Sequence, residues 1–264
     1  MDRPSSAAAF LADLAASGRY HFTTREAVSR LGGSEPAVRA SLRRLKARGE
    51  VAAPYRGFHV IVPPEYRRLG CLPPEQFVPQ LMEHLGEPYY VALLSAAELH
   101  GAAHHRPQAL QVMVEVNRRP IACGSSRVEF VARRDLRRTP TLQVNTPRGT
   151  LRVASREATA LELVGYADRC GGLDNVAAVL EELAEEIDSE ELRETAGLCP
   201  VVWVQRLGYL LDVVDHRALA DTLVETVRTR AVVVAPLVRS ASRAGAERVS
   251  RWRVAVNASV ERDS

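Results

Sequence analysis

Apolar residues early in the chain recur at the spacing of one buried helix face. Val38, Leu42 and Leu45 lie three or four positions apart, which predicts an amphipathic helix that stops at Gly49. Pro36 falls in the first turn of this helix, where the missing N–H of proline costs little. The pattern therefore predicts a helix with one face in a core and the other in solvent.

A shorter helix is predicted just before it, over residues 25–31. Thr24 stands at the position of its N-cap, and Gly32-Gly33 interrupts it, because glycine adopts backbone angles that other residues avoid. Ser34 then stands at the N-cap of the following helix. Two short helices joined by a tight turn are typical of a helix-turn-helix.

Short strand patterns surround these helices. Residues 50–54 and 58–62 predict a hairpin around Tyr55-Arg56-Gly57, and residues 20–22 predict a third strand for it. A first helix is predicted over residues 5–17. Together these elements predict a winged helix-turn-helix.

The rest of the chain shows mainly strand patterns first and helix patterns afterwards. Helices are predicted at 74–85 and 88–100, strands at 110–116, 127–132, 142–146 and 150–154, helices at 157–167, 176–187, 201–214 and 217–229, and a late strand at 252–257. Ser155 and Asp174 stand at the N-caps of the first two helices after the strands. Segregated strands and helices favour an α+β fold over a doubly wound one. The predicted domains are residues 1–68 and 69–264.

The charge of the chain is distributed unevenly. The formal net charge is +3, yet residues 1–68 hold 12 Lys and Arg against 6 Asp and Glu, a net +6. Residues 151–230 hold 8 against 16, a net −8. The positive excess therefore coincides with the predicted helix-turn-helix, where it favours a polyanionic partner.

A basic stripe runs along the second helix of this motif. Arg39, Arg43 and Lys46 recur at i, i+4 and i+7 on a face away from the apolar one. Arginines on a helix are usually a solvated surface, and this chain holds 34 of them beside its single lysine. The conjunction of turn, caps, stripe and wing nevertheless predicts that the second helix enters the major groove of double-stranded DNA.

Each part of the motif has an expected role at DNA. The start of the second helix approaches base edges, where Arg39 is suited to a guanine O6/N7 pair. The other cations meet phosphates, and the starts of both helices present free amides that favour phosphate. The candidate DNA-binding residues are Thr24, Arg25, Ser34, Glu35, Arg39, Arg43, Arg44, Lys46, Tyr55 and Arg56.

The composition argues against several other classes. No run of 18 apolar residues exists, so no membrane span is predicted. The apolar stretch at residues 7–12 lacks a basic preceding region and indicates a first helix rather than a signal peptide. The four cysteines are far apart without metal-ligand spacing, which predicts a cytoplasmic, reduced protein without a cofactor or structural metal.

A metal-dependent enzyme has weak support in the sequence. His100, His104 and His105 have the spacing of metal ligands, but Gly101 makes their helix doubtful and no metalloprotease glutamate follows. No phosphate-binding loop, dinucleotide motif or nucleophile elbow is present. The sequence therefore predicts a protein that is not an enzyme.

Carboxylates on neighbouring predicted strands raise the possibility of a nuclease. Glu115 and Asn117 come near Glu129, but many such sites need a lysine, and the only one is Lys46 in the helix-turn-helix.

A second acidic feature is the segment 181–188, which suits either a solvated helix face or a surface for a basic partner protein.

Three segments carry a resemblance to a known family. They are Tyr89-Tyr90-Val91-Ala92-Leu93-Leu94-Ser95-Ala96-Ala97-Glu98-Leu99-His100-Gly101, Ser155-Arg156-Glu157-Ala158-Thr159-Ala160-Leu161-Glu162-Leu163 and Gly171-Gly172-Leu173-Asp174-Asn175-Val176. With the winged helix before them, they make the chain resemble the AbiEi-type antitoxins of type IV toxin–antitoxin systems over nearly its whole length.

The resemblance implies a function for each half of the chain. The winged helix would bind repeated sites in its own promoter as an autorepressor, and the second half would oppose a nucleotidyltransferase-like toxin without necessarily forming a stable complex with it. Two rival interpretations stay open. One is a one-component regulator whose second domain senses a small ligand, and the other is a nucleic-acid enzyme.

Overall fold

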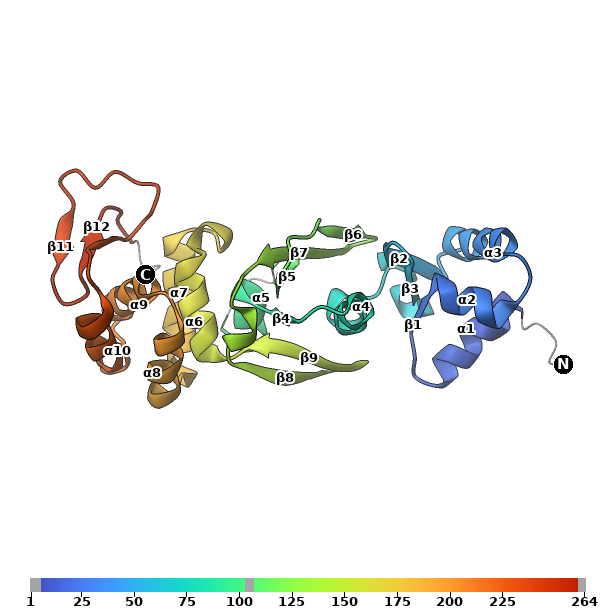
Figure 1. Ribbon diagram of the computed structural model, residues 1–264, viewed down its shortest axis with the longest axis horizontal. Helices are drawn as coiled ribbons and strands as arrows, with labels where there is room; N and C mark the ends of the chain where they lie inside the picture. Colours follow the sequence, from blue (N-terminus) through green and yellow to red (C-terminus); the bar gives the residue numbers. More distant parts are fainter. Residues whose placement is uncertain (1–5, 103–106, 261–264) are drawn as a thin grey trace. The chain divides into compact units, whose positions relative to one another are not determined.

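The computed structural model describes residues 6–102 and 107–260, and the chain divides into two compact units (Figure 1). Unit 1 comprises Met1–Tyr89, Gln108–Arg134 and Gln143–Arg152, and unit 2 comprises Tyr90–Pro107, Asp135–Leu142 and Val153–Ser264. Helices and strands are both abundant, so the predicted α+β class is confirmed. The predicted domain boundary after residue 68 stays a prediction.

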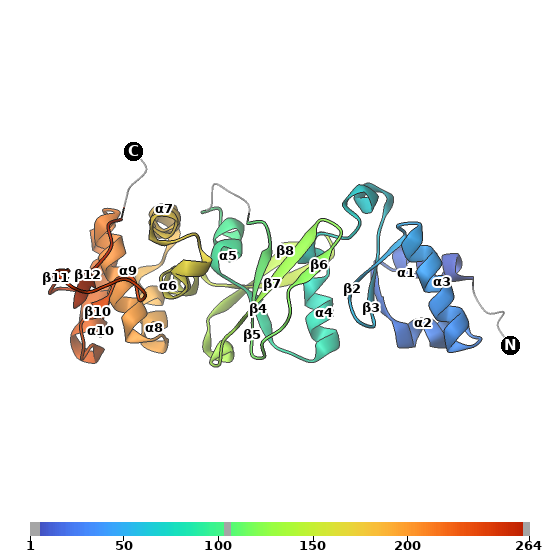
Figure 2. The same cartoon turned by 90° about the horizontal axis from the view of Figure 1, so that it is seen from above.

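The first part of unit 1, residues 7–62, is called the N-terminal module below. Its elements are α1 (Ala7–Ala16), β1 (His21–Thr23), α2 (Thr24–Leu31), α3 (Glu35–Ala47), β2 (Val51–Tyr55) and β3 (Phe58–Ile61). The strands form an antiparallel sheet in the order β1-β3-β2, in which Val60 pairs with both His21 and Ala52. The three helices lie on one side of this sheet (Figures 1 and 2).

The core of the N-terminal module follows the predicted apolar pattern. Val38, Leu42 and Leu45 are all buried on the inner face of α3. Phe10 of α1 meets Phe22 of β1 edge to face, with ring centroids 5.2 Å apart. Burying each such side chain contributes about 1.5–3 kcal/mol, so this face fixes α3 against α1 and the sheet.

The start of α2 differs from the prediction. Thr23, and not Thr24, is the N-cap, because the Thr23 Oγ1 atom accepts the free amide of Glu26 at 3.1 Å. Thr24 is already inside the helix. The predicted break after α2 is confirmed by positive φ angles of 65° at Gly32 and 83° at Gly33. Ser34 occupies the N-cap of α3 as predicted, but its side chain makes no capping hydrogen bond.

The remaining elements of unit 1 form a second layer of strands and short helices. They are η1 (Pro64–Leu69), η2 (Pro74–Gln76), α4 (Val78–Leu85), β5 (Leu110–Val114), β6 (Ile121–Cys123) and β7 (Ser126–Ala132). β7 pairs with β5 in parallel and with β6 antiparallel. A Cβ atom at Gly124 would lie 2.1 Å from the Leu69 carbonyl oxygen, so only glycine lets these backbones approach. Cys71 and Cys123 both lie in this layer as free thiols, without a disulfide.

Three strands run across the unit boundaries in the sequence, namely β4 (Tyr89–Val91), β8 (Thr141–Thr146) and β9 (Gly149–Ala154). In unit 2, β4 pairs with β9 in parallel at Val91 and Val153. The other elements of unit 2 are α5 (Leu93–Leu99), η3 (Leu136–Arg138), α6 (Arg156–Gly165), η4 (Ala167–Arg169), α7 (Leu173–Leu183), η5 (Ala184–Glu186), α8 (Ser189–Leu198), α9 (Val201–Val213), α10 (Arg217–Arg230), β10 (Ala235–Pro236), β11 (Glu247–Val249) and β12 (Val254–Val256).

Several predictions for these segments were wrong. Residues 88–100 are not one helix, because the β-forming run of β4 pairs with β9 and Leu93 takes a φ of 55° before α5. Asp174 is not the N-cap of α7, since Gly172 holds that position and Asp174 lies in the first turn. Helix α8 was missed, although Asp188 caps it by accepting the amides of Glu190 and Glu191. The short strands β6, β10 and β11 were missed as well.

Helix α6 is the buried centre of unit 2. Every residue from Glu157 to Val164 is buried, including three polar ones. The Tyr90 hydroxyl donates to the Glu162 carboxylate at 2.6 Å, which gives one of these buried oxygens a partner. The predicted N-cap at Ser155 is confirmed, because its hydroxyl oxygen accepts the amide of Ala158.

Candidate nucleic-acid interface

A groove runs along α3 on the side of the hairpin β2–β3. It has a volume of about 480 Å³ and is lined by Thr24, Pro36, Arg39, Leu42, Arg43, Lys46, Ala53 and His59. Helix α2, helix α3 and both strands of the hairpin therefore contribute to one surface. The structure brings together four of the predicted residues here, namely Thr24, Arg39, Arg43 and Lys46.

The three cations of this groove are exposed side chains on α3. The Arg39 guanidinium donates through Nε and Nη2 to the Glu35 carboxylate, at 2.8 and 2.6 Å. Both side chains of this ion pair are more than half exposed, at 61% and 54%. A pair this exposed contributes only about 0.3–0.5 kcal/mol, so a better acceptor can displace Glu35.

His59 is a groove residue that the sequence interpretation missed. It lies on β3, and alternation along the strand places it on the face opposite the buried Phe58 and Val60. Its Nε2 atom is 2.9 Å from the Thr24 Oγ1 atom, and its ring stacks on Phe22 at 5.1 Å. The alternation of apolar and polar residues along this strand was the sequence signal from which His59 could have been found.

The environment of His59 keeps its imidazole neutral. Burial lowers its pKa from the ordinary value of 6.5, and the positive charges of Lys46 and Arg39 lower it further. A neutral ring leaves the cationic character of the groove to α3.

This lowered pKa predicts a pH dependence of stability. Near and below pH 6.5 the unfolded chain binds more protons at His59 than the folded chain does. The burial of neutral His59 therefore stabilises the fold above that pH. This contribution to the free energy of unfolding is lost as the pH falls through the lowered pKa of His59 in the folded chain. We expect the melting temperature to fall between about pH 7 and pH 5, and His59→Gln to reduce that fall. Thermal unfolding followed by circular dichroism measures both.

Two other histidines also contribute to the pH dependence of stability. Burial also lowers the pKa of His21 and of His100, so a residual fall is expected in the His59→Gln protein. A variant whose melting temperature keeps the full wild-type pH dependence would contradict this account of His59.

The remaining predicted residues lie outside the groove lining. Arg25, Ser34, Glu35 and Arg44 are exposed around the helix starts and along α3, and Arg56 is exposed in the turn of the hairpin. Arg44 donates to the Ser41 hydroxyl at 3.0 Å.

Tyr55 is engaged within unit 1 instead of facing the groove. Its hydroxyl accepts a hydrogen bond from Arg118 at 3.0 Å, and Arg118 also pairs with Glu87. Arg148 packs over the ring of Tyr20 with 3.4 Å between the guanidinium carbon and the ring centroid. These contacts hold both ends of the small sheet against the rest of unit 1.

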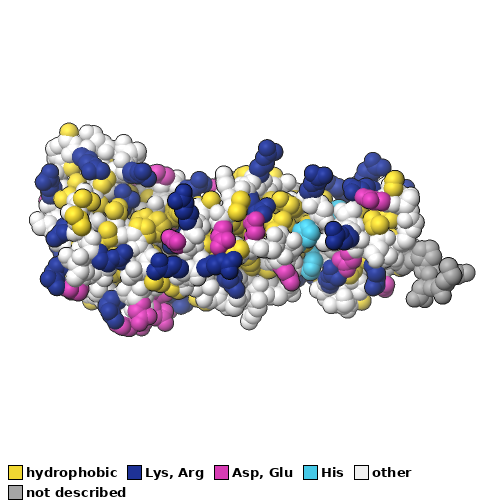
Figure 3. Space-filling model, in the orientation of Figure 1, with side chains coloured by type: hydrophobic (Ala, Val, Ile, Leu, Met, Phe, Trp, Pro, Cys, Tyr) yellow, Lys and Arg dark blue, Asp and Glu magenta, His cyan; other side chains and the backbone are white. Residues whose placement is uncertain are grey.

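The surface of the N-terminal module matches the charge of its sequence. On the face that Figure 3 shows, its exposed charged side chains are predominantly Lys and Arg. Together with the net +6 of residues 1–68, this gives the groove a field that attracts anions.

Among residues 6–102 and 107–260, no three His, Cys, Asp or Glu side chains are grouped to hold an ion. His104 and His105 lie outside the described residues, while the His100 Nε2 atom is 2.8 Å from the Ala154 carbonyl oxygen. In the same part of the chain, every helix is too short or too polar to cross a bilayer.

Comparison with known proteins bears on both halves of the chain. The fold resembles the crystal structure of the RV2827C protein from Mycobacterium tuberculosis, with a TM-score of 0.71 and 18% sequence identity over 96% of this chain and 92% of that one. At this identity the likeness shows the fold alone. The comparison with curated protein sequences gave no match.

In structural class the protein is mixed α+β, and its N-terminal module carries a basic groove. Residues 90–213 match the family model of the AbiEi antitoxin C-terminal domain. The chain therefore carries an AbiEi antitoxin domain, as its motifs predicted, and this match supports the role of an antitoxin in a toxin–antitoxin system. The N-terminal module lies outside the matched residues.

Proposed function

We propose that the N-terminal module is a winged helix-turn-helix that binds double-stranded DNA, and that the protein represses its own promoter at repeated sites. The observation that carries this proposal is the groove in which Arg39, Arg43 and Lys46 line the exposed side of α3 beside the hairpin β2–β3. A helix with such a stripe suits the major groove, and the hairpin turn with Arg56 suits the neighbouring backbone.

Arg39 is the proposed reader of a base. Its side chain is near the start of α3, where a recognition helix meets base edges. A bidentate contact to guanine O6 and N7 discriminates against a wrong base by about 1–3 kcal/mol. That exceeds the fraction of a kcal/mol that the exposed pair with Glu35 contributes, so the guanidinium exchanges Glu35 for the base.

Arg39→Ala is expected to weaken binding to the operator by about 1–3 kcal/mol and to relax the preference at one base position. Fluorescence anisotropy with operator and scrambled duplexes gives both affinities at a fixed salt concentration. Arg67→Ala is the matched control, because Arg67 is exposed on η1 and outside the groove lining. Unchanged discrimination between the two duplexes in the Arg39→Ala protein would remove Arg39 from base reading.

The second half of the proposal concerns the toxin. Residues 69–264 are proposed to act as the antitoxic domain against a nucleotidyltransferase-like toxin in the cytoplasm, without catalysis of their own. The match to the AbiEi antitoxin C-terminal domain supports this assignment. In the type IV scheme the antitoxin opposes the toxin's effect, so direct contact between the two proteins is not required.

The two halves of the proposal are separable by experiment. A chromosomal reporter fused to the promoter measures repression, and growth of cells that carry the toxin measures neutralisation. The Arg39→Ala protein is expected to lose repression while it still protects cells. Loss of both activities in a variant that folds normally would contradict a division of labour along the chain.

A further inference from the structure

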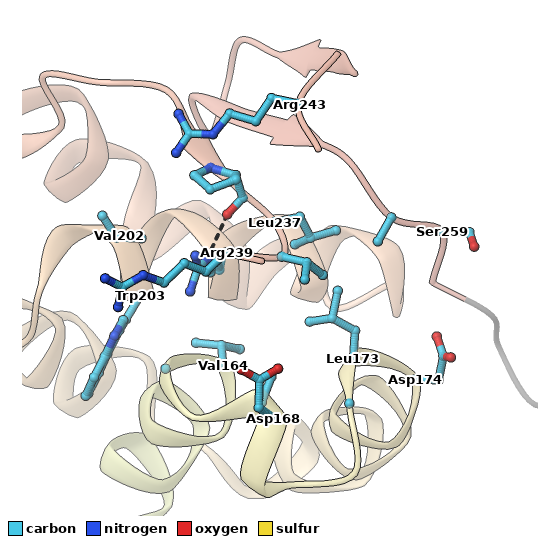
Figure 4. Close-up of a pocket in the computed structure, with 17 residues that line it drawn as sticks. Val164, Asp168, Leu173, Asp174, Val202, Trp203, Leu237, Arg239, Arg243 and Ser259 are labelled. Atoms are coloured by element: carbon cyan, nitrogen blue, oxygen red, sulfur yellow. Dashed lines mark hydrogen bonds between the residues drawn. The ribbon is translucent and has the colours of Figure 1, made fainter. Parts of the chain in front are cut away.

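Unit 2 contains a pocket to which the proposed function assigns no role. It has a volume of about 630 Å³ and lies between η4, the start of α7, helix α9 and the segment that follows β10. Figure 4 shows Asp168 and Leu173 on one side of it, and Leu237 and Arg243 on the opposite side. Small-molecule sites in proteins have volumes of about 300–1,000 Å³, so this pocket is of the right size.

A buried arginine forms part of the wall. Arg206 lies on α9 and is 9% exposed. Its Nε atom donates to the Pro236 carbonyl oxygen at 3.0 Å, the bond drawn as a dashed line in Figure 4. Among the described residues, its two terminal amino groups have no hydrogen-bond partner and the side chain forms no ion pair. Neither amino group is enclosed by the protein, so an anion in the pocket can reach both.

Two more arginines line the same space. Arg239 and Arg243 both come from the segment after β10, and both are exposed. Burial lowers the pKa of Arg206 and the positive charge of Arg239 lowers it further, so the positive charges act against one another here. Asp168 lines the pocket too and offsets part of this charge, but it lies beyond ion-pair distance of Arg206.

The start of α7 adds to the positive potential. Gly172 is the N-cap with a φ of 93°, and both it and Leu173 line the pocket. The free amides and dipole of a helix start favour an anion. Asp174 in the same turn is exposed and partly offsets this effect.

The rest of the wall is apolar. Val164, Leu173 and Leu237 line it from α6, α7 and the segment after β10. A ligand of this pocket therefore has an anionic group for the arginines and a carbon body for these side chains. Phosphate suits the anionic part, because its oxygens can accept from more than one guanidinium fork at once.

We propose that this pocket binds a small organic phosphate, with the phosphate at Arg206, Arg239 and Arg243 and the carbon body against Val164, Leu173 and Leu237. The site goes beyond the DNA-binding and antitoxin roles. It lies wholly in unit 2, so its occupancy can be measured without DNA or toxin.

Isothermal titration of the full chain with phenyl phosphate tests the proposal, with inorganic phosphate and benzoate as reference probes. We expect one site per chain, and affinity for phenyl phosphate at least about tenfold above that for either reference, since each lacks one feature the site recognises. Arg239→Gln is expected to weaken phenyl phosphate about tenfold or more, because it removes a charge-assisted contact.

The substitutions separate a loss of phenyl phosphate binding from a loss of folding. Arg239 and Arg243 are exposed, so their Gln variants are expected to keep the wild-type melting temperature, whereas Arg206→Gln also removes the bond to Pro236. Arg217→Gln is the matched control, because Arg217 is exposed at the start of α10 and outside the pocket. Three results would overturn the site: no saturable binding of phenyl phosphate, equal weakening by Arg217→Gln, or full affinity in both the Arg239 and Arg243 variants.

Discussion

The variant with Arg39→Ala, Arg43→Ala and Lys46→Ala together is expected to lose operator affinity by a factor on the order of a thousand. Each lost phosphate contact costs about fivefold at physiological salt through the counterions that it no longer releases. The lost base contact of Arg39 adds about 1–3 kcal/mol, which is roughly fivefold to 150-fold. All three side chains are exposed on α3, so the fold of the N-terminal module is expected to survive.

The salt dependence separates the roles of these residues. Loss of the two phosphate contacts from Arg43 and Lys46 is expected to reduce the slope of log affinity against log salt by about 2. The control carries Arg193→Ala, Arg217→Ala and Arg228→Ala, which removes the same charge from exposed positions of unit 2. Equal losses in the two triple variants would mean that net charge, and not the α3 groove, governs DNA binding.

Trp252→Ala is expected to destabilise unit 2 by about 3–5 kcal/mol, because it empties a large site in a packed core. Trp252 is fully buried, and its ring lies so close to α9 that a Cβ atom at Gly208 would be 2.2 Å from the ring. Its indole Nε1 donates to the Asp212 carboxylate at 2.6 Å, and the variant loses this bond as well. The ring therefore fixes the segment before β12 on α9.

Chemical unfolding followed by circular dichroism measures this loss directly. For a unit of this size, each kcal/mol moves the melting temperature by about 2–4 °C, so a fall of roughly 6–20 °C is expected. Val232→Ala serves as the control, because Val232 is 90% exposed and its truncation is expected to change stability by less than about 0.5 kcal/mol. A change of similar size in both variants would contradict the packing role of Trp252.

The N-terminal module was largely predictable because its signals are local. The apolar face of α3, the Gly32-Gly33 break and the hairpin each depend on residues close together in sequence, and each was found. The choice between Thr23 and Thr24 as the N-cap failed because two adjacent threonines fit the same rule. Only the direction of each hydroxyl separates them, and the packing of Thr24 against His59 sets that direction.

Unit 2 was less predictable because its decisive contacts join distant segments. Helix α8 has few apolar residues, so its pattern is weak, and β10 and β11 are too short to alternate. The residues around Arg206 look like a plain apolar helix in the sequence. Its place beside Arg239 depends on how the chain returns after α10, which local patterns do not encode.

The central claim is that α3 and its wing read a DNA sequence. Gel-shift binding of the purified protein to the DNA just upstream of its own gene, with scrambled competitor at physiological salt, tests it most directly. The account predicts a complex that scrambled DNA does not displace, that Arg39→Ala weakens, and that the triple variant Arg39→Ala, Arg43→Ala and Lys46→Ala abolishes. Binding that scrambled DNA removes equally well would contradict sequence-specific autorepression, and no binding at all would contradict a role of the groove at DNA.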